Sequence, residues 1–475
     1  MNNQYPVKIV QFGEGVFLRA FIDWMVQTMN DAGNFGGSVC VVKPRPGDFS
    51  PAYAAQGMRY TVSLKGLLGG KRVDKRQRID CIGAMVNPYA DYDGWLAQAD
   101  NPGLVCVVSN TTESGIVPSP ADSAADRPAA SFPGKLTQFL RRRYETFGGD
   151  PKRGLLVIPC ELIENNSKIL KDLVLGHASR WHADAAFDSW LANANTWVDT
   201  LVDRIVTGFT AEEKARVLAG DGFEDDLVAV AEPYHILALQ GPESLESVLP
   251  LRASGVNAVW AGDISPYRDL KVRLLNGSHT LMTMLGLPLG AKIVHDALAN
   301  PTVMEVLRAY QFAETIPVIT LPEAECREYF ASVLERFSNP DLIHKLEGIS
   351  AKSVAKFGAR IMPTVRGHFA RTGKAPVFAG LVLAAIAWRY LQNFTIPDEP
   401  SAIAHFTTRA SIFASDPEAA MRDLLGPAGP WGDVNAQVPG FAAAAAASYR
   451  VIFGKGFEAA MKEAISRARG EKESW

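Results

Sequence analysis

The chain contains few cysteines, and none of them form a CxxC pair. Its 475 residues include five scattered cysteines: Cys40, Cys81, Cys106, Cys160 and Cys326. An odd number of scattered cysteines argues against a disulfide scaffold. Four of them lie in or beside apolar runs, so we expect buried, reduced thiols in a cytosolic protein.

Long apolar runs and a strong charge of one sign are also missing. No run approaches 18 uninterrupted apolar residues, and Met1–Pro6 lacks the basic region and apolar core of a secretion signal. The 48 Lys and Arg residues nearly balance the 51 Asp and Glu residues, for a net charge of −3. This balance favours neither nucleic acid nor an anionic membrane as a partner. We therefore expect a cytoplasmic protein that acts on a small molecule, with local Lys or Arg side chains meeting any acidic group.

The motifs of two common kinds of catalytic site are missing as well. The eight histidines are dispersed without HxH or HxxxH spacing, which disfavours a metal-dependent sugar isomerase or epimerase. We accordingly expect no metal. A GxxxxGK[ST] loop is absent too, which argues against phosphoryl transfer.

The chain is long enough for two domains, and its pattern changes near Gly262–Tyr267. Short buried-strand runs alternate with helical segments before this point. After it, helical periodicity and alanine-rich segments such as Phe378–Leu391 dominate. We predict an α/β protein with a Rossmann-like, NAD(P)-binding domain over residues 1–264. A mostly helical domain over residues 265–475 would carry the catalytic and substrate-binding residues.

The opening segment predicts a dinucleotide site. Val7–Phe12 reads as a buried strand, followed by a Gly-Glu-Gly turn and a helix that runs to about Met29. Glycines in this context let backbone N–H groups approach a pyrophosphate at the helix N-terminus. Leu18 replaces the third glycine of the usual fingerprint. The expected cofactor contacts here are Gly13, Gly15, Phe17 and Arg19.

The choice between NAD and NADP stays open at the end of the next strand, Ser38–Val42. An NAD site commonly has an acidic residue there, which binds the adenosine ribose. This chain continues with Lys43-Pro-Arg45, and Asp48 comes later. The two basic residues would equally suit the 2′-phosphate of NADP.

Polar residues follow two further predicted strands. Leu104–Ser109 is followed by Asn110, Thr111, Thr112 and Glu113, which we expect to meet the nicotinamide side of a cofactor. Capping of the next helix is the alternative use of such residues. The strand Gly154–Cys160 is likewise followed by an acidic and amide-rich turn that ends near Asn166.

The stretch Lys271–His279 contains the candidate catalytic residues. On a helix that turns roughly 100° per residue, Asn276 lies about 140° and His279 about 80° from Lys271, so the three can face one pocket. An amine of lowered pKa could remove the proton of a secondary alcohol, while an amide and an imidazole hold the oxygen. The alternative is a solvated or hydrogen-bonded polar face.

Several motifs resemble the polyol-specific long-chain dehydrogenases, the mannitol dehydrogenase family, over nearly all of the chain. Within the family, the chain is most similar to the members that reduce the hexuronate tagaturonate to altronate. The segments that carry the resemblance are Gln11–Phe21, Ser109–Glu113, Ile158–Ile163, Leu201–Gly208, Gln240-Gly-Pro, Lys271-x4-Asn276-x2-His279 and Asn339-Pro340 with His344.

The resemblance implies metal-independent hydride transfer between NAD(H) and a linear sugar acid or polyol. It makes Lys271 the general acid and base, and Asn276 and His279 the residues that polarise the reacting oxygen. It also implies catalytic and substrate-binding roles for Asn166 and for Asp203 and Arg204. For the base role, the surroundings of Lys271 must lower its pKa from the usual ~10.4.

A hexuronate substrate would need fixed cations for its carboxylate. Lys356 and Arg360 lie one turn apart and share a helix face, and His344 is close in sequence. Helix-surface charges are the alternative interpretation of this pair.

Other activities remain open on these motifs. A fructuronate reductase, a mannitol 2-dehydrogenase or an arabinitol dehydrogenase would use the same catalytic face. A dinucleotide-binding sensor without chemistry is a more distant alternative, because it would not need Lys271, Asn276 and His279 together.

Overall fold

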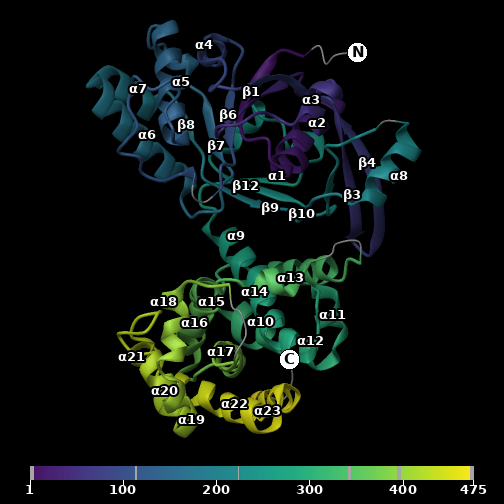
Figure 1. Ribbon diagram of the computed structural model, residues 1–475, viewed down its shortest axis with the longest axis vertical. Helices are drawn as coiled ribbons and strands as arrows, with labels where there is room; N and C mark the ends of the chain where they lie inside the picture. The colour runs from purple at the N-terminus through teal and green to yellow at the C-terminus, as the bar shows by residue number, and fades with distance from the viewer. Residues whose placement is uncertain (1–4, 113–114, 223, 341–343, 393–396, 471–475) are drawn as a thin grey trace. The chain divides into compact units, whose positions relative to one another are not determined.

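A computed structural model of the chain describes residues 5–112, 115–222, 224–340, 344–392 and 397–470 (Figure 1). The chain forms two compact units. Unit 1 comprises Met1–Gly66 and Arg72–Ile264, and unit 2 comprises Leu67–Lys71 and Ser265–Trp475. Glu113 lies outside the described residues, so its expected role in cofactor binding stays a sequence-based prediction.

The described strands belong almost entirely to unit 1. They are β1 Val7–Phe12, β2 Ser38–Val42, β3 Tyr60–Leu68, β4 Lys71–Ile79, β5 Ile82–Val86, β6 Cys106–Ser109, β7 Leu156–Pro159, β8 Thr196–Trp197, β9 Thr200–Asp203, β10 Val206–Thr207, β11 Ala229–Ala231, β12 Ile236–Gln240 and β13 Ala258–Ala261. The helices of unit 1, in which η marks π or 3-10 turns, are α1 Val16–Leu18, η1 Arg19–Asp23, α2 Trp24–Asp31, α3 Pro51–Ala55, α4 Tyr92–Leu96, η2 Ala97–Asp100, α5 Phe132–Thr146, η4 Pro151–Arg153, α6 Asn166–His182, α7 Ala185–Asn193, α8 Ala211–Asp221, η5 Glu243–Ser247 and η6 Arg252–Ser254.

The main sheet of unit 1 is parallel, with the strand order β5-β2-β1-β6-β7-β8. The chain order reverses between β1 and β6, and a doubly wound sheet binds its ligand at this point, beyond the carboxyl ends of the strands. A four-stranded sheet, β10-β11-β3-β4, and a three-stranded sheet, β13-β12-β9, complete the unit.

Both faces of the main sheet are covered by helices. Val10 and Phe12 of β1 pack with α5 and α6, whereas Ile9 packs on the opposite face with the helix that follows the glycine turn. Figure 1 shows α5, α6 and α7 on one side of the sheet and α1 and α2 on the other. Since side chains alternate along a strand, strands covered on both faces read as continuous apolar runs. This property made the first strands recognisable in the sequence.

Unit 2 is helical apart from the β3–β4 turn. Its helices are α9 Ser265–Leu270, η7 Lys271–Asn276, α10 Gly277–Gly286, η8 Leu287–Leu289, α11 Val294–Ala299, α12 Pro301–Ala309, η9 Tyr310–Thr315, η10 Ile316–Val318, α13 Glu323–Phe337, α14 Leu346–Ser350, α15 Ser353–Arg360, α16 Met362–Thr372, α17 Val377–Tyr390, α18 Pro400–Thr407, α19 Ala410–Ser415, α20 Pro417–Leu424, α21 Val434–Gln437, α22 Phe441–Lys455 and α23 Phe457–Arg469. The prediction of a Rossmann-like part followed by a mostly helical part is confirmed.

The centre of unit 2 is helix α17, which is buried around nearly its whole circumference. A helix of this kind has to be apolar on every side. Gly380 permits close packing with α22, since a Cβ there would lie only 3.3 Å from the backbone nitrogen of Ala445. The buried carboxylate of Glu314 accepts hydrogen bonds from the N–H groups of Phe378 and Ala379, at 2.7 and 3.0 Å, and so caps the N-terminus of α17. Burial raises the pKa of Glu314 to about 7.

The stretch with the candidate chemistry begins with a π-helical turn, η7. The prediction of a regular helix across Lys271–Asn276 was therefore wrong. The i→i+5 bonding of a π turn brings residue i+5 closer to the face of residue i than a regular α-helix does. Asn276 is thus turned towards the side that Lys271 occupies.

Gln311, on the π segment η9 that follows η7 in unit 2, supports this widened turn. Its fully buried amide nitrogen lies 3.3 and 3.4 Å from the carbonyl oxygens of Arg273 and Leu274, and 2.9 Å from Ser278 Oγ. A widened turn disturbs the regular ladder of backbone hydrogen bonds, and a buried carbonyl without a donor is costly. The amide of Gln311 supplies a donor at this place.

Three further findings bear on the class of protein. All five cysteines are buried and free of disulfides. No described helix is long and apolar enough to cross a membrane. Among the described residues, no three His, Cys, Asp or Glu side chains gather in a way that could hold a metal ion.

Replacing Gln311 tests the support of the π turn. We expect Gln311→Leu to lower the free energy of unfolding by about 1–3 kcal/mol, because the buried carbonyl of Arg273 and the hydroxyl of Ser278 each lose a hydrogen bond. Urea unfolding followed by circular dichroism measures this loss. The exposed Gln437, bonded to Arg366, provides the control Gln437→Leu. Equal unfolding midpoints for the two variants would show that Gln311 does not support the turn.

Candidate active site

Unit 1 contains a pocket of about 590 Å³ beyond the carboxyl ends of β1, β2 and β6. This is the place where the strand order reverses and where a doubly wound sheet binds dinucleotides. The lining residues are Gly13, Glu14, Gly15, Lys43, Pro44, Arg45, Pro46, Asn110, Thr111 and Thr112. The pocket thus brings together five of the residues predicted to bind a cofactor.

The two glycines of the turn suit a dinucleotide for different reasons. Gly13 has a φ of +126°, and a Cβ there would lie 2.9 Å from Leu18 Cδ1 and 3.1 Å from the carbonyl oxygen of Asn110. No atom lies within 4 Å of a Cβ built on Gly15, and Gly15 lines the pocket. A side chain at this position would therefore extend into the space of the pocket. Gly15 also begins the helix without a side-chain cap, so N–H groups at the helix N-terminus remain for an anionic group. These features fit a pyrophosphate.

The polar residues after β6 are held in place by the turn after β7. Asn110 Nδ2 donates to the carbonyl of Cys160 at 2.9 Å, and both the N–H and the hydroxyl of Thr111 donate to Glu161 Oε1. Glu161 is only 2% exposed, and burial raises its pKa. Sequence reasoning did not single out Glu161, although its place directly after a central strand was a usable signal.

Phe17 and Arg19 do not line the pocket. Phe17 stacks on Phe21, with ring centroids 4.9 Å apart. The guanidinium of Arg19 donates to the carbonyl of Leu227 and lies over the ring of Tyr60. Both side chains anchor the helix that follows the glycine turn.

Asn166 is fully buried, and its side-chain amide is fully engaged. Its Nδ2 donates to the carbonyls of Pro159 and Glu161 and to Thr200 Oγ1, at 2.9–3.1 Å. Its Oδ1 accepts from the N–H groups of Ser167 and Thr200. The amide therefore joins β7, β9 and α6. These contacts hold the framework of unit 1 together, whereas the sequence predicted a catalytic role for Asn166.

Asp203 and Arg204 are buried in unit 1 as well. The Arg204 guanidinium lies 4.2 Å from the centre of the Trp24 ring and donates to the carbonyls of Ala20 and Glu232. Burial lowers the pKa of Arg204 to about 9. Neither residue lines the dinucleotide pocket.

In unit 2, the predicted catalytic residues share one helical stretch, formed by η7 and α10. Lys271 and Asn276 are half-buried, and His279 is only 5% exposed. The His279 ring stacks on Phe337 at 4.3 Å and meets the His344 ring edge-on at 4.8 Å. Within the described part of the chain, His279 Nε2 is buried and has no hydrogen-bond partner. A substrate oxygen would provide one.

Positive charges surround His279. Its pKa lies well below the usual value because of burial first, and then because of His344, Arg360, Arg336 and Lys356. His279 is consequently neutral at neutral pH. A neutral imidazole can still donate one hydrogen bond to a developing oxyanion.

The predicted cations for a carboxylate reach this place from helix α15. Arg360 Nη1 lies 3.3 Å from both the carbonyl oxygen of Asn276 and Thr280 Oγ1. Lys356 Nζ donates to the carbonyl of Ile349 at 2.7 Å. Burial lowers the pKa of Arg360 to about 10, and burial followed by the charge of Arg360 lowers that of Lys356 to about 8. The structure thus brings His279, His344, Lys356 and Arg360 together around one site.

Sequence reasoning missed Arg336 and Phe337 at the end of α13. Arg336 is only 4% exposed, and its charge acts on His279. The two residues sit at the end of an amphipathic helix, where a basic residue is ordinarily explained by the helix dipole. Their place beside His279 follows only from the packing of α13 against η7.

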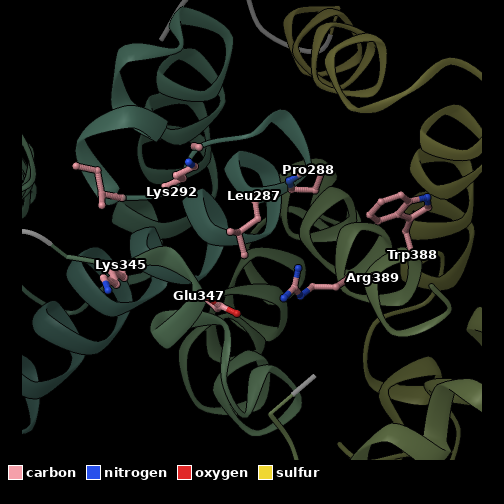
Figure 2. A pocket seen from close by; sticks show the side chains of 9 residues that line it. Leu287, Pro288, Lys292, Lys345, Glu347, Trp388 and Arg389 are labelled. Carbon is pink, nitrogen blue, oxygen red and sulfur yellow. The ribbon is translucent and has the colours of Figure 1, made fainter. Parts of the chain in front are cut away.

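Another pocket, of about 610 Å³, lies in unit 2 and contains none of the predicted site residues (Figure 2). It is lined by Leu287, Pro288, Ala291, Lys292, Ile293, Lys345, Glu347, Trp388 and Arg389. Lys292, Lys345 and Glu347 are exposed. Solvent screens such charges strongly, so this groove is a weaker candidate for chemistry than the surroundings of His279.

Comparison with known proteins agrees with the two-part architecture. A family model described as the mannitol dehydrogenase Rossmann domain matches residues 7–252, and one described as the mannitol dehydrogenase C-terminal domain matches residues 263–449. The chain is similar to a protein from Bacillus subtilis (strain 168) named altronate oxidoreductase, with 39% identity over 85% of this chain and 84% of the relative. It is also similar to an altronate oxidoreductase from Klebsiella pneumoniae (strain 342), with 34% identity over 97% of each chain.

Two solved structures share the fold. A D-sorbitol dehydrogenase in substrate-free form matches with a TM-score of 0.81 and 21% identity, over 97% of this chain and 96% of that one. The mannitol 2-dehydrogenase of Pseudomonas fluorescens, in a ternary complex with NAD and D-mannitol, matches with a TM-score of 0.74 and 22% identity, over 98% and 96%. From the family models and the relatives together, the chain belongs to the mannitol dehydrogenase family, whose members are oxidoreductases acting on CH–OH groups.

Proposed function

We propose that the protein is an NAD-dependent, metal-independent oxidoreductase that interconverts tagaturonate and altronate. The observation that carries the substrate class is the set of cations around His279: Arg336, Lys356 and Arg360 act on one buried imidazole. Desolvated cations of this kind bind a carboxylate strongly. A neutral polyol such as mannitol would bring no negative charge to this set of cations.

The names of the relatives support the same substrate. Curated relatives that cover 97% of this chain are called altronate oxidoreductase, and altronate is a sugar acid. The preference for NAD is supported by the family and by the fit of the glycine turn to a dinucleotide. We assign the nucleotide to the pocket lined by Gly13, Gly15, Asn110, Thr111 and Thr112.

The residues of unit 2 would carry the proton chemistry. In the reduction, the ammonium of Lys271 gives a proton to the carbonyl oxygen of the substrate, and in the oxidation its amine takes the proton back. His279 Nε2 and the amide of Asn276 hold that oxygen by hydrogen bonds as negative charge develops on it. Bound NADH supplies the hydride for reduction, and NAD⁺ accepts it in the reverse direction.

The remaining residues have roles in positioning. Lys356 and Arg360 would bind the carboxylate, and His344 packs edge-on against His279. Arg360 also contacts the backbone of Asn276, so it joins the carboxylate site to the catalytic stretch. We assign Asn166, Asp203 and Arg204 to the framework of unit 1 rather than to contact with substrate.

Removing the amine of Lys271 tests the proposed acid and base. We expect Lys271→Met to lower the rate of NADH oxidation with tagaturonate by about 10²–10⁴-fold, the usual contribution of general acid–base catalysis. NADH affinity, followed by fluorescence, stays nearly unchanged. Lys455→Met, an exposed change in the same unit, serves as the control. A variant that keeps more than a tenth of the wild-type rate would contradict the assignment.

Substituting Lys356 tests the carboxylate site. The wild type should prefer tagaturonate to the neutral ketose fructose, and Lys356→Met should lower the ratio of the two kcat/KM values by about 10- to 100-fold, because a charge-assisted hydrogen bond is lost. The exposed Lys352, one turn earlier, gives the control Lys352→Met. A uniform small effect on both ketoses would remove Lys356 from the site, and faster wild-type turnover of fructuronate or fructose would reassign the substrate.

The pKa of Lys356 gives this site a pH signature. Burial and Arg360 lower that pKa to about 8, so the ammonium that binds the carboxylate is present below pH 8 and is lost above it. The preference for tagaturonate over fructose should therefore fall as the pH rises through 8. Titrations that affect both substrates alike cancel in the ratio. In Lys356→Arg the ratio should stay constant over this range.

A further inference from the structure

Glu14 lies between the two glycines of the dinucleotide turn, and its side chain forms an ion pair with Lys43. The two side chains are only 24% and 12% exposed. Lys43 is the first residue after β2, where an NAD site commonly has its ribose-binding acid. The ion pair therefore brings the carboxylate of Glu14 to the end of β2 from a different segment.

Neighbouring contacts fix both partners. The hydroxyl of Tyr53 donates to the carbonyl of Glu14 at 3.3 Å, and the N–H of Gly13 donates to the carbonyl of Val42 at 3.1 Å. The ammonium of Lys43 lies 5.2 Å from the centre of the Phe49 ring. The turn and the end of β2 are thus joined both by backbone and by side chains.

We propose that Glu14 replaces the acidic residue missing after β2, accepts hydrogen bonds from the adenosine ribose and disfavours the 2′-phosphate of NADP. A carboxylate has about four acceptor sites, so the contact with Lys43 leaves capacity for the ribose hydroxyls. A 2′-phosphate would bring negative charge up to this carboxylate. The inference rests on the proposed function, because it requires the pocket to hold a nicotinamide dinucleotide.

The pairing also changes the interpretation of the two basic residues. Lys43 and Arg45 both line the pocket, and from the sequence they equally suited NADP. Lys43 is neutralised by Glu14, whereas Arg45 is exposed to solvent, where its charge is screened. Removing the Glu14 charge would leave two cations beside the ribose and favour a phosphate there.

Direct binding of NADH and NADPH to the full chain, without any sugar, tests the proposal. The fluorescence of the reduced nicotinamide gives the two dissociation constants. We expect the wild type to bind NADH more tightly. In Glu14→Gln, the ratio of the NADPH to the NADH dissociation constant should fall at least tenfold. Asp48→Asn provides the control, since Asp48 is an exposed carboxylate on the same loop that does not line the pocket.

The outcomes separate the inference from the function that it rests on. If the wild type binds neither NADH nor NADPH, the proposed function fails. If the wild type binds NADPH more tightly than NADH, the proposed role of Glu14 is wrong and the dinucleotide site stands. The same holds if the wild type binds NADH but the ratio of the two dissociation constants is equal in Glu14→Gln and Asp48→Asn. Circular dichroism of Glu14→Gln verifies that the comparison is made on a folded chain.

Discussion

The hydrogen bonds from Gln311 to the π turn at Lys271–Asn276 are the interaction on which the proposed chemistry of unit 2 depends. A regular α-helix would place Asn276 about 140° around the axis from Lys271. The widened turn brings the two closer to one face, but it disturbs the ladder of backbone hydrogen bonds. A buried amide on a neighbouring π segment compensates, so the catalytic stretch and its support are two irregular helices packed together.

The second constraint is electrostatic. Burying several cations around one imidazole is unfavourable, because each loses water and repels the others. The lowered pKa values of His279, Lys356 and Arg360 express that cost. A carboxylated substrate would relieve it. Burial, together with the same charges, keeps His279 neutral, which suits a hydrogen-bond donor to the reacting oxygen.

The pocket of unit 1 depends instead on the two glycines of its turn. Gly13 allows a conformation and a close approach that a side chain would prevent, and Gly15 leaves the pocket open. Glu161, Thr111 and Asn110 join the ends of β6 and β7 beneath the site. We propose that such a site binds a nicotinamide dinucleotide and that Glu14 contributes to the choice between NAD and NADP.

Much of this architecture could be predicted from the sequence, because strands buried on both faces are continuous apolar runs. Val7–Phe12 and Ser38–Val42 were predicted to the residue. Strand β4 was not, since its sequence from Lys71 is highly charged and largely exposed and resembles a loop. The pairing of Lys356 with Arg360 follows from their helical spacing, whereas their placement around His279, together with Arg336, required the tertiary packing.

The framework role of Asn166 and the π turns could not be predicted for related physical reasons. An asparagine that joins two strands and a helix has the same local sequence as one that faces a substrate. A π turn depends on a donor such as Gln311, about 40 residues away in the sequence. The pairing of Glu14 with Lys43 also becomes visible only once the turn and the end of β2 are placed together.

The most direct test of the central claim is a crystal structure of the protein with NAD and altronate bound. The account predicts the altronate carboxylate within hydrogen-bond distance of Lys356 or Arg360, and the reacting hydroxyl at Lys271 Nζ and His279 Nε2. Altronate bound instead in the groove lined by Trp388 and Arg389, or with its carboxylate away from the cations around His279, would contradict it.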